Sequence, residues 1–414
     1  MAILKPFRAV RPTTKYAKDV AALPYDVMTS DEAREIVKDN PYSFLHIDKA
    51  EIDLDKSVSI YDEKVYLKAR ENLDKLSSDG IFMQDDKDCI YIYRQTMNGR
   101  NQTGLVGCAS IDEYINNTIK KHEFTRADKE QDRINHVDYC NANTGPIFLT
   151  YKDSEKINTI VSNWQNENKP IYDFVSSDGI AHTVWVIDDS SVTSTIQSSF
   201  EKVDSLYIAD GHHRAASAVK VGLKRRQENP DYTGKEEFNF FLSVAFPASE
   251  LAIMDYNRVI KDLNGMTSQE FLSKIEDNFI ITKLDGNNAY RPEKAHTFGM
   301  YLDNSWYKLE AKPNSFDKSS PVDSLDVSIL QNNLIHPILN IDDPRTSQRI
   351  DFVGGIRGLE ELERRVKDDM VVAFSMYPTT IEELMAIADS GNVMPPKSTW
   401  FEPKLLSGLF VHKL

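Results

Sequence analysis

Five consecutive residues from Asp210 to Arg214 bring together a carboxylate, two imidazoles and a guanidinium. The Asp210 carboxylate can hold Mg²⁺ or accept a proton, and Arg214 carries a fixed positive charge. His212 and His213 add hydrogen-bonding groups that can act near neutral pH. This set of groups suits the binding of phosphates and the transfer of a phosphoryl group. The alternative interpretation is an ordinary Asp-Gly turn followed by surface side chains without a chemical role.

The residues on either side predict a short strand and a helix, with this cluster at their junction. Leu206 to Ala209 form an apolar run typical of a buried strand, and the alanine-rich stretch after Arg214 favours a helix that ends before Pro230. Gly211 lets the chain turn sharply and lets a ligand approach the backbone. The first N–H groups of the helix have no partner within it and point outward. We therefore expect Gly211, His213 and Arg214 to bind phosphate.

A second stretch, Lys121 to Arg126, is unusually dense in charge. Glu123 can act as a general base, with His122 and Arg126 beside it for contact with a substrate. Further charges follow at helical spacing, at Asp128, Asp132 and Arg133. The alternative interpretation is a solvated helix whose ion pairs each contribute ~0.3–0.5 kcal/mol, and composition alone favours that alternative.

The third candidate lies near the C-terminus, in Met394-Pro-Pro-Lys-Ser-Thr399. Lys397, Ser398 and Thr399 offer an ammonium and two hydroxyl groups to a phosphate, and the two prolines before them stiffen the chain. The glycines of a Walker loop are absent, so this is not a nucleotide loop of that type. We expect the loop to fold back toward the Asp210 cluster and to close one side of it. The alternative is a rigid turn that only leads into the last strand.

Composition argues against several classes of protein. With 41% hydrophobic and 10% aromatic residues among 414, the chain can form real cores and is not disordered by default. The formal charge of −15 argues against broad binding to nucleic acid or to anionic membranes. The longest apolar stretch is too short to span a bilayer, and no signal-peptide pattern is present. Three cysteines without metal-ligand spacing indicate reduced thiols, so we expect a cytoplasmic protein without a membrane partner.

Alternating strands and helices predict a mixed α/β fold, in part α+β, with three regions at 1–111, 112–262 and 263–414. No Gly-x-Gly-x-x-Gly and no His-Glu-x-x-His pattern occurs, which argues against a Rossmann dinucleotide enzyme and against a zinc helix.

Several local elements follow from the pattern of residues. Cys89 to Tyr93 is typical of a strand, and we expect it to pair with Leu105 to Ala109 across a turn at Asn98-Gly99. Ser43 to Ile47 is predicted to be a strand as well. Thr380 is expected to be the N-cap of a helix that continues to residue 390.

Four pieces of the chain are distinctive. They are Leu23-Pro-Tyr-Asp-Val27, Lys121-His-Glu-Phe-Thr-Arg126, Ala209-Asp-Gly-His-His-Arg214, and Met394 to Phe401 with Pro403-Lys404 and Ser407-Gly-Leu409. In this order they resemble a bacterial and archaeal family of conserved proteins, domain-of-unknown-function family 1015. The match covers nearly the full length, so the chain is identified as a member. Membership by itself implies no activity.

The motif Asp210-Gly-His-His-Arg214 also looks like the nucleotide-binding motif of free serine kinases, which belong to the ParB/sulfiredoxin superfamily. The resemblance implies a ParB/sulfiredoxin-like nucleotide-binding core in the middle region. It places Asp210 and His212 at the transferring phosphate. The order of the motifs makes Glu123, next to His122, the counterpart of the catalytic Glu, although the spacing to Asp210 is much longer here.

Other members of that superfamily differ from this chain at specific features. Sulfiredoxins carry a Cys at the position of His212, so sulfinic-acid reduction is not expected here. ParB partition proteins carry a helix-turn-helix and basic surfaces, and neither feature is found in this sequence.

These observations together predict a nucleotide-dependent kinase or phosphotransferase that acts on the hydroxyl group of a small molecule, with serine among the candidates. ATP or ADP would be the phosphoryl donor, and Asp210 would bind Mg²⁺ or orient the nucleophile. His212 would stabilise the transferring group, and Glu123 would deprotonate the acceptor. Two alternatives stay open: a nucleotide-binding switch or adaptor with little catalysis, and a metal-dependent phosphohydrolase. The expected partners are the nucleotide and the small-molecule substrate, without nucleic acid.

Overall fold

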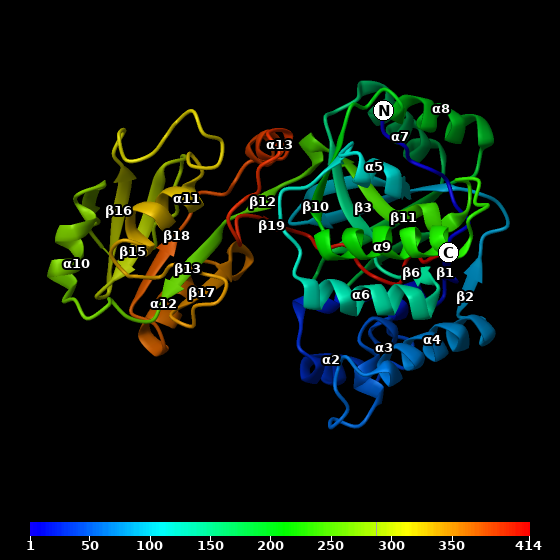
Figure 1. Cartoon of the computed structure of the whole chain (residues 1–414), viewed down its shortest axis with the longest axis horizontal. Helices are drawn as coiled ribbons and strands as arrows, with labels where there is room; N and C mark the ends of the chain where they lie inside the picture. Colours follow the sequence, from blue (N-terminus) through cyan, green and yellow to red (C-terminus); the bar gives the residue numbers. More distant parts are fainter. Residues whose placement is uncertain (287) are drawn as a thin grey trace. The chain divides into compact units, whose positions relative to one another are not determined.

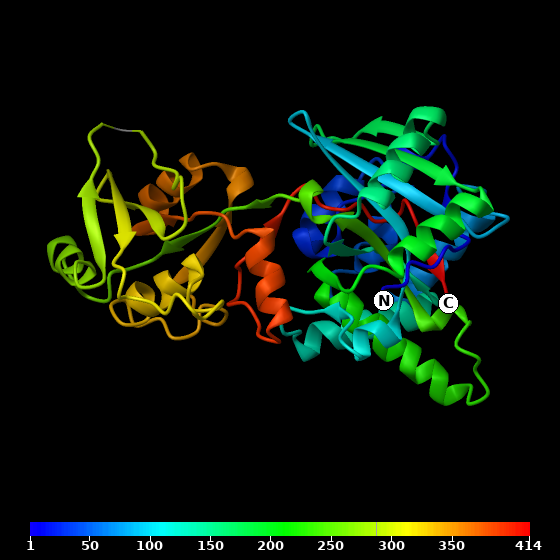
Figure 2. The ribbon, with the colours of Figure 1, turned by 90° about the horizontal axis from the view of Figure 1, so that it is seen from above.

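The structure, a computed structural model, describes residues 1–286 and 288–414. The chain forms two compact units (Figures 1 and 2). The first unit contains Met1–Leu251 together with Pro403–Leu414, and the second contains Ala252–Glu402. The C-terminus therefore belongs to the same unit as the N-terminus.

An eight-stranded mixed sheet forms the centre of the first unit (Figure 1), in the order β5-β10-β7-β11-β4-β3-β9-β8. Along the chain these strands are β3 (Ile90–Met97), β4 (Arg100–Ser110), β5 (Ile119–Lys120), β7 (Ile147–Tyr151), β8 (Tyr172–Val175), β9 (Ala181–Ile187), β10 (Leu206–Asp210) and β11 (Phe240–Pro247). β10 runs parallel to β5, β11 runs parallel to β7, and the other neighbouring pairs are antiparallel. β10 therefore lies one strand from the edge of the sheet.

Helices cover this sheet and extend the unit. They are α1 (Ala17–Val20), α2 (Ser30–Val37), α3 (Leu45–Asp48), α4 (Glu63–Ser78), α5 (Ile111–Ile115), α6 (Ala127–Cys140), α7 (Glu155–Glu167), α8 (Ser190–Phe200) and α9 (His212–Glu228), with short 3-10 turns at Tyr25–Val27, Ala50–Asp53, Glu237–Asn239 and Ala248–Glu250. α9 packs alongside α6 (Figure 1). Ala215, Ala218 and Val219 of α9 share one buried cluster with Leu206 and Ile208 of β10, so the apolar side of α9 anchors the helix on the strand that precedes it.

The C-terminal segment is built into the first unit through backbone pairing. Val411 pairs with Val10 and Ser407 pairs with Ala22 as isolated bridges. β20 (His412–Lys413) pairs with β6 (Ala142–Asn143), and β1 (Val10–Pro12) pairs with β2 (Phe82–Gln84). The amide of Gln95 also donates to the carbonyl of Lys404 at 2.8 Å. These contacts fix the position of Lys404 against the sheet.

The second unit contains a six-stranded antiparallel sheet in the order β14-β16-β15-β18-β13-β17. Its strands are β13 (Tyr256–Ile260), β14 (Phe279–Lys283), β15 (Thr297–Leu302), β16 (Ser305–Ala311), β17 (Ile350–Gly354) and β18 (Val372–Ser375). Its helices are α10 (Ser268–Ile275), α11 (Asp326–Leu330), α12 (Glu360–Asp368) and α13 (Ile381–Asp389), with a π-helical turn at Gln331–Ile335 and a 3-10 turn at Gly355–Arg357. A separate short pair joins β12 (Ile253–Met254) to β19 (Trp400–Phe401).

The mixed α/β architecture is confirmed, as are two of the local predictions. β3 and β4 form the hairpin around Asn98-Gly99, and Thr380 caps α13 in a capping box with Glu383. The predicted strand at residues 43–47 is wrong, because Leu45–Asp48 form helix α3. Phe44, Leu45 and Ile47 are all buried, so this short segment is enclosed on several sides and lacks the two-faced exposure on which a strand pattern depends.

The division into units differs from the three regions expected from the sequence. The boundary at 111–112 falls inside the first unit, where β4 leads directly into α5 and strands from both sides share one sheet. The second junction lies at 251–252, and the last twelve residues, 403–414, return to the first unit. Among the described residues, no helix combines the length and the apolar character needed to cross a membrane.

Candidate functional site at the start of helix α9

The predicted strand-to-helix junction is present: β10 ends at Asp210 and α9 begins at His212. Gly211 between them has a φ of 93°, which other L-residues rarely adopt. A Cβ atom at this position would also lie 3.2 Å from Nε of Arg214. The N–H of Gly211 donates to Oδ1 of Asp210 at 2.7 Å, so the carboxylate folds back onto the turn that leads into α9.

Lys404 is part of this site, although the sequence did not single it out as a site residue. Its Nζ donates to Oδ2 of Asp210 at 3.2 Å. Burial raises the pKa of Asp210, but the charges of Lys404 and Arg214 and the hydrogen bonds to the carboxylate outweigh burial and hold the pKa below its usual range. Asp210 is therefore ionised at neutral pH. One indication that Lys404 matters was present in the sequence: it lies in the Pro403-Lys404 piece that carries the family resemblance.

Two buried imidazoles lie edge to face at the junction. The ring centroids of His122 and His212 are 4.5 Å apart, with an interplanar angle of 84°. Burial lowers the pKa of His122 to about 4, although Asp210 acts in the opposite direction. Burial, followed by the effect of His122, lowers the pKa of His212 well below its usual value. Both rings are therefore neutral at pH 7. Among the described residues, Nδ1 of His122 and Nε2 of His212 have no hydrogen-bond partner.

Glu123 meets this junction from a distant part of the sequence. Its Oε2 lies 3.7 Å from Nδ1 of His212, and its side chain is 53% exposed. Because His212 is neutral at pH 7, the contact is not an ion pair at that pH. The arrangement places a solvent-accessible carboxylate beside a buried, neutral imidazole.

His213 and Arg126 connect the two segments that supply the site. The backbone N–H of Arg126 donates to Nε2 of His213 at 3.0 Å. Nε2 is therefore an acceptor in this contact, and burial lowers the pKa of the ring. The guanidinium of Arg126 pairs with Asp128, at 2.9 Å on the exposed surface. His213 thus holds the segment that carries Glu123 against the first turn of α9.

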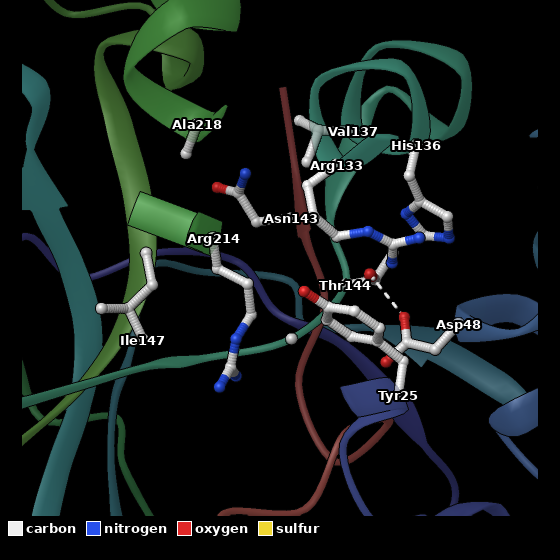
Figure 3. A pocket seen from close by; sticks show the side chains of 11 residues that line it. Tyr25, Asp48, Arg133, His136, Val137, Asn143, Thr144, Ile147, Arg214 and Ala218 are labelled. Carbon is white, nitrogen blue, oxygen red and sulfur yellow. Dashed lines mark hydrogen bonds between the residues drawn. The ribbon is translucent and has the colours of Figure 1, made fainter. Parts of the chain in front are cut away.

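Arg214 directs its side chain toward a small pocket beneath the junction (Figure 3). Its Nη1 donates to the carbonyl of Pro146 at 2.5 Å, and its Nε has no partner among the described residues. Burial lowers the pKa of Arg214, but the charges of Asp26 and Asp210 outweigh burial and hold the pKa above its usual value. The guanidinium therefore stays charged.

The same pocket connects the motif to another distinctive piece of the sequence. Besides Arg214 it is lined by Tyr25, Asp48, Arg133, His136, Val137, Asn143, Thr144, Gly145, Ile147 and Ala218. The guanidinium of Arg133 lies 4.1 Å from the ring centroid of Tyr25. The hydroxyl of Thr144 donates to Asp48 at 2.8 Å, the dashed line in Figure 3. Tyr25, from the Leu23–Val27 piece, is thereby packed close to the Asp210–Arg214 motif.

Lys397, Ser398 and Thr399 belong to the second unit, where the structure describes their contacts. The carbonyl of Lys397 accepts from Nη2 of Arg258 at 3.0 Å. The hydroxyl of Ser398 donates to the carbonyl of Pro395 at 2.6 Å, so this hydroxyl is used within the loop itself. The expectation that the loop closes the Asp210 site stays a prediction.

A Mg²⁺ ion at the junction would need oxygen ligands. Among the described residues, no group of three or more His, Cys, Asp or Glu side chains is placed to hold a metal ion. Asp210 and Glu123 are the carboxylates identified at the junction, and Asp210 is already paired with Lys404. Mg²⁺ commonly uses one or two carboxylates together with water and substrate phosphates. The donor set therefore fits Mg²⁺ that arrives with a phosphate, and the metal role of Asp210 stays a prediction.

The fold and the site together define a mixed α/β protein with a charged strand-to-helix junction at the end of β10. The chain belongs to the family described as protein of unknown function (DUF1015), whose model matches residues 4–328. The family membership expected from the four sequence pieces is thus confirmed. No protein of curated function matches the chain in sequence.

Solved structures with a similar arrangement share little sequence with this chain. A free serine kinase variant in complex with AMP is 13% identical, covering 72% of this chain and 86% of that chain with a TM-score of 0.36. A conserved hypothetical protein from Pyrococcus furiosus is 14% identical, covering 74% and 94%, with a TM-score of 0.35. SbnI from Staphylococcus aureus, truncated at its C-terminus, is 9% identical, covering 73% and 85%, with a TM-score of 0.35.

Proposed function

We propose that this protein is a nucleotide-dependent phosphotransferase that moves a phosphoryl group to the hydroxyl of a small molecule. One observation carries the proposal: the exposed Glu123 carboxylate lies beside His212 in the first turn of α9, and Lys404 pairs with Asp210 at the end of the preceding strand. A base for a hydroxyl group and a cradle for phosphates then lie at the same junction. Phosphoryl transfer requires both.

The donor side of the proposal is the start of α9. The first N–H groups of a helix this long have no partner within it, and the helix dipole favours negative charge at this end. Gly211 lets a phosphate approach the backbone closely. Lys404 adds a cation beside Asp210, and the neutral His212 can donate a hydrogen bond without a change of charge.

The acceptor side is Glu123. In the proposed reaction the acceptor hydroxyl gives its proton to Glu123 while its oxygen forms a bond to the terminal phosphorus. The bond from that phosphorus to the rest of the nucleotide breaks, and its electron pair leaves with the nucleotide. Mg²⁺ bound with the phosphates would neutralise their charge. In this proposal Asp210 is the residue that would hold the ion.

The proposal is tested by incubating the protein with Mg²⁺, ADP or ATP, and a panel of free amino acids and other small hydroxyl compounds. AMP is included because the similar free serine kinase structures are complexes with AMP and with ADP. Phosphorus NMR then identifies the products. We expect a new phosphomonoester with at least one acceptor, and serine is the first acceptor to try.

Variants of two glutamates separate the site from the rest of the molecule. Glu123→Gln should lower the transfer rate by about 10²–10⁴-fold, the usual contribution of a general base. Glu167→Gln, at the exposed end of α7, is the matched control and should keep the wild-type rate. Free phosphate as the sole product would favour a phosphohydrolase, and saturable nucleotide binding without turnover would favour a switch. Either result would contradict the kinase proposal.

A further inference from the structure

The 395–399 loop of the second unit has a rigid backbone whose carbonyl groups are held by side chains. The hydroxyl of Ser398 donates to Pro395 O, and the hydroxyl of Thr379 donates to Ser398 O at 2.9 Å. The guanidinium of Arg258 donates to Lys397 O at 3.0 Å. Three carbonyl groups of the loop are thus directed toward partners inside the unit.

Of the residues in this loop, Lys397 is exposed and Ser398 is buried. Lys397 has a φ of 58°, in the left-handed region that a lysine rarely occupies. Among the described residues, the N–H groups of Lys397, Ser398 and Thr399 have no hydrogen-bond partner. Successive N–H groups around a left-handed residue form a concave arrangement that binds anions.

Arg258 places a positive charge directly behind the loop. It is 4% exposed, and its guanidinium donates to the carbonyls of Tyr256 and Lys397. Among the described residues no carboxylate pairs with it, and Asp255, three residues earlier in the chain, is paired with Arg291. Burial lowers the pKa of Arg258 to about 10, although Tyr256 acts in the opposite direction. A buried charge without a partner destabilises a fold unless another group compensates for it.

Aromatic side chains complete this face of the second unit. The ring of Trp400 lies 5.0 Å from that of Tyr256, and Nζ of Lys397 lies 5.5 Å from the Tyr256 ring. A Cβ atom on Gly354 would lie 2.8 Å from Trp400, so glycine at that position lets the indole pack against β17. The loop therefore holds an exposed ammonium, three N–H groups and a reporter indole in fixed positions.

We propose that the 395–399 loop is a binding site for a phosphoryl group, with Lys397 and the loop N–H groups as ligands and Arg258 as the positioning residue. Arg258 fixes the carbonyl of Lys397 and supplies a field that favours negative charge above the loop. The site lies within the second unit, and its existence does not depend on the activity proposed for the Asp210 junction. The phosphoryl group can be part of a nucleotide or free phosphate.

Trp400 offers a readout that is specific for this loop. The chain has four tryptophans, and the difference between the emission of the wild-type protein and that of Trp400→Phe isolates the signal of Trp400. The full chain is titrated with inorganic phosphate, pyrophosphate, AMP, ADP and adenosine. We expect saturable changes with the phosphate-bearing compounds and none with adenosine. Tighter binding of AMP and ADP than of phosphate and pyrophosphate would assign a nucleotide, and the reverse order would assign free phosphate.

Two lysines make a matched pair of variants. Lys397→Ala should weaken pyrophosphate binding by about tenfold or more, since a charge-assisted hydrogen bond is lost. Lys283 also has its Nζ over a tyrosine ring of the second unit, 5.8 Å from the centroid of Tyr307. Lys283→Ala should therefore leave the affinity unchanged. Equal affinity of Lys397→Ala and wild type would overturn the proposal.

Two variants of Arg258, one that keeps the positive charge and one that removes it, test whether the charge is what matters. Arg258→Lys keeps the cation and should retain most of the affinity, whereas Arg258→Met should lose at least tenfold. Thermal unfolding of both variants is measured in parallel, and if Arg258→Met does not fold, the Lys397 pair still decides the question. Phosphoryl transfer without any Trp400 response would overturn this inference alone. A Trp400 response without transfer would overturn only the function proposed for the Asp210 junction.

Discussion

The turn at Gly211 and the 395–399 loop both present cations and backbone N–H groups, but they reach a positive φ with different residues. Gly211 has a φ of 93° and Lys397 has a φ of 58°. Glycine adopts this region without a steric penalty, whereas a residue with a Cβ pays about 1–2 kcal/mol. The turn at Gly211 is therefore relaxed. The 395–399 loop stores strain that its side-chain contacts must maintain.

The two segments also differ in how their charges are satisfied. At the first turn the Asp210 carboxylate is paired with Lys404, and the neighbouring His122 and His212 are neutral. In the second unit Arg258 is buried without a carboxylate partner among the described residues. A junction that holds carboxylates beside its cations can handle protons and phosphates together, whereas a buried cation without a carboxylate partner is suited to hold an anion.

The largest expected effect is a loss of stability in acid, caused by the buried imidazole of His122. The pKa of His122 is lower in the folded protein than in the unfolded chain, so the unfolded state binds more protons below pH ~6.5. The contribution of His122 to stability is fully present above that pH and is lost as the pH falls toward 4. The loss is about 1.4 kcal/mol per unit of pKa difference, or roughly 3 kcal/mol between pH 6.5 and 4. Urea unfolding between pH 7 and 4 measures this loss.

His122→Gln removes the titrating group, so its unfolding free energy should vary less with pH over that window. Lys397→Ala changes the other segment and should keep the wild-type slope. An unchanged slope in His122→Gln would show that the acid sensitivity arises elsewhere in the chain.

The second effect concerns the pairing of Asp210. Lys404→Met should lower the free energy of unfolding at pH 7 by about 1–2 kcal/mol, because a mostly buried carboxylate loses its cation. The pKa of Asp210 is lowered in the folded protein, so its contribution to stability is present above pH ~4 and is lost as the pH falls through the folded pKa. In Lys404→Met the folded pKa of Asp210 should rise toward the unfolded value, so the stability lost in this pH window should be smaller than in the wild type.

An exposed pair provides the control for this variant. Lys56 pairs with Asp31 at 2.7 Å, and both side chains are about 70% exposed. Lys56→Met should change stability by less than about 0.5 kcal/mol at the same pH. If the two methionine variants lose the same amount, Asp210 and Lys404 do not form the closed pair that distinguishes the first segment.

The third effect concerns the backbone at the first turn. Gly211→Ala should destabilise the protein by about 1–2 kcal/mol from the positive φ, with a further loss from contact with Arg214. Gly234 has a φ of 86° and nothing within 4 Å of an added Cβ. Gly234→Ala therefore measures the φ penalty alone by chemical denaturation. A smaller loss for Gly211→Ala than for Gly234→Ala would contradict the crowding by Arg214.

The smallest expected effect has the opposite sign. Lys397→Gly relieves the strain of a left-handed lysine but adds the conformational entropy of glycine to the unfolded chain, so the net gain should be about 0.5 kcal/mol. Lys397→Ala keeps a Cβ and should show no gain. Destabilisation by Lys397→Gly would mean that the lysine side chain contributes more to the loop than its backbone strain costs.

Much of the local structure follows from short-range patterns. The hairpin of β3 and β4 was predictable because Asn98-Gly99 favours a tight turn between two apolar runs. The capping box at Thr380 needed only the Glu three residues later. The predicted strand at residues 43–47 failed because Phe44, Leu45 and Ile47 are buried by residues from elsewhere in the chain, which no local pattern reports.

What the sequence by itself determined is the strand-turn-helix at Asp210–Arg214, since an apolar strand, a glycine and an alanine-rich helix are local signals with a single consistent solution. Only the tertiary structure brought Lys404 to Asp210 and Glu123 to His212, and left Arg258 without a carboxylate partner among the residues that the structure describes. Those contacts depend on how distant segments pair: the C-terminal strand returns to β6, and α6 packs on α9. Pairing of this kind is set by burial and backbone hydrogen bonds summed over the whole unit, and no spacing along the chain encodes it.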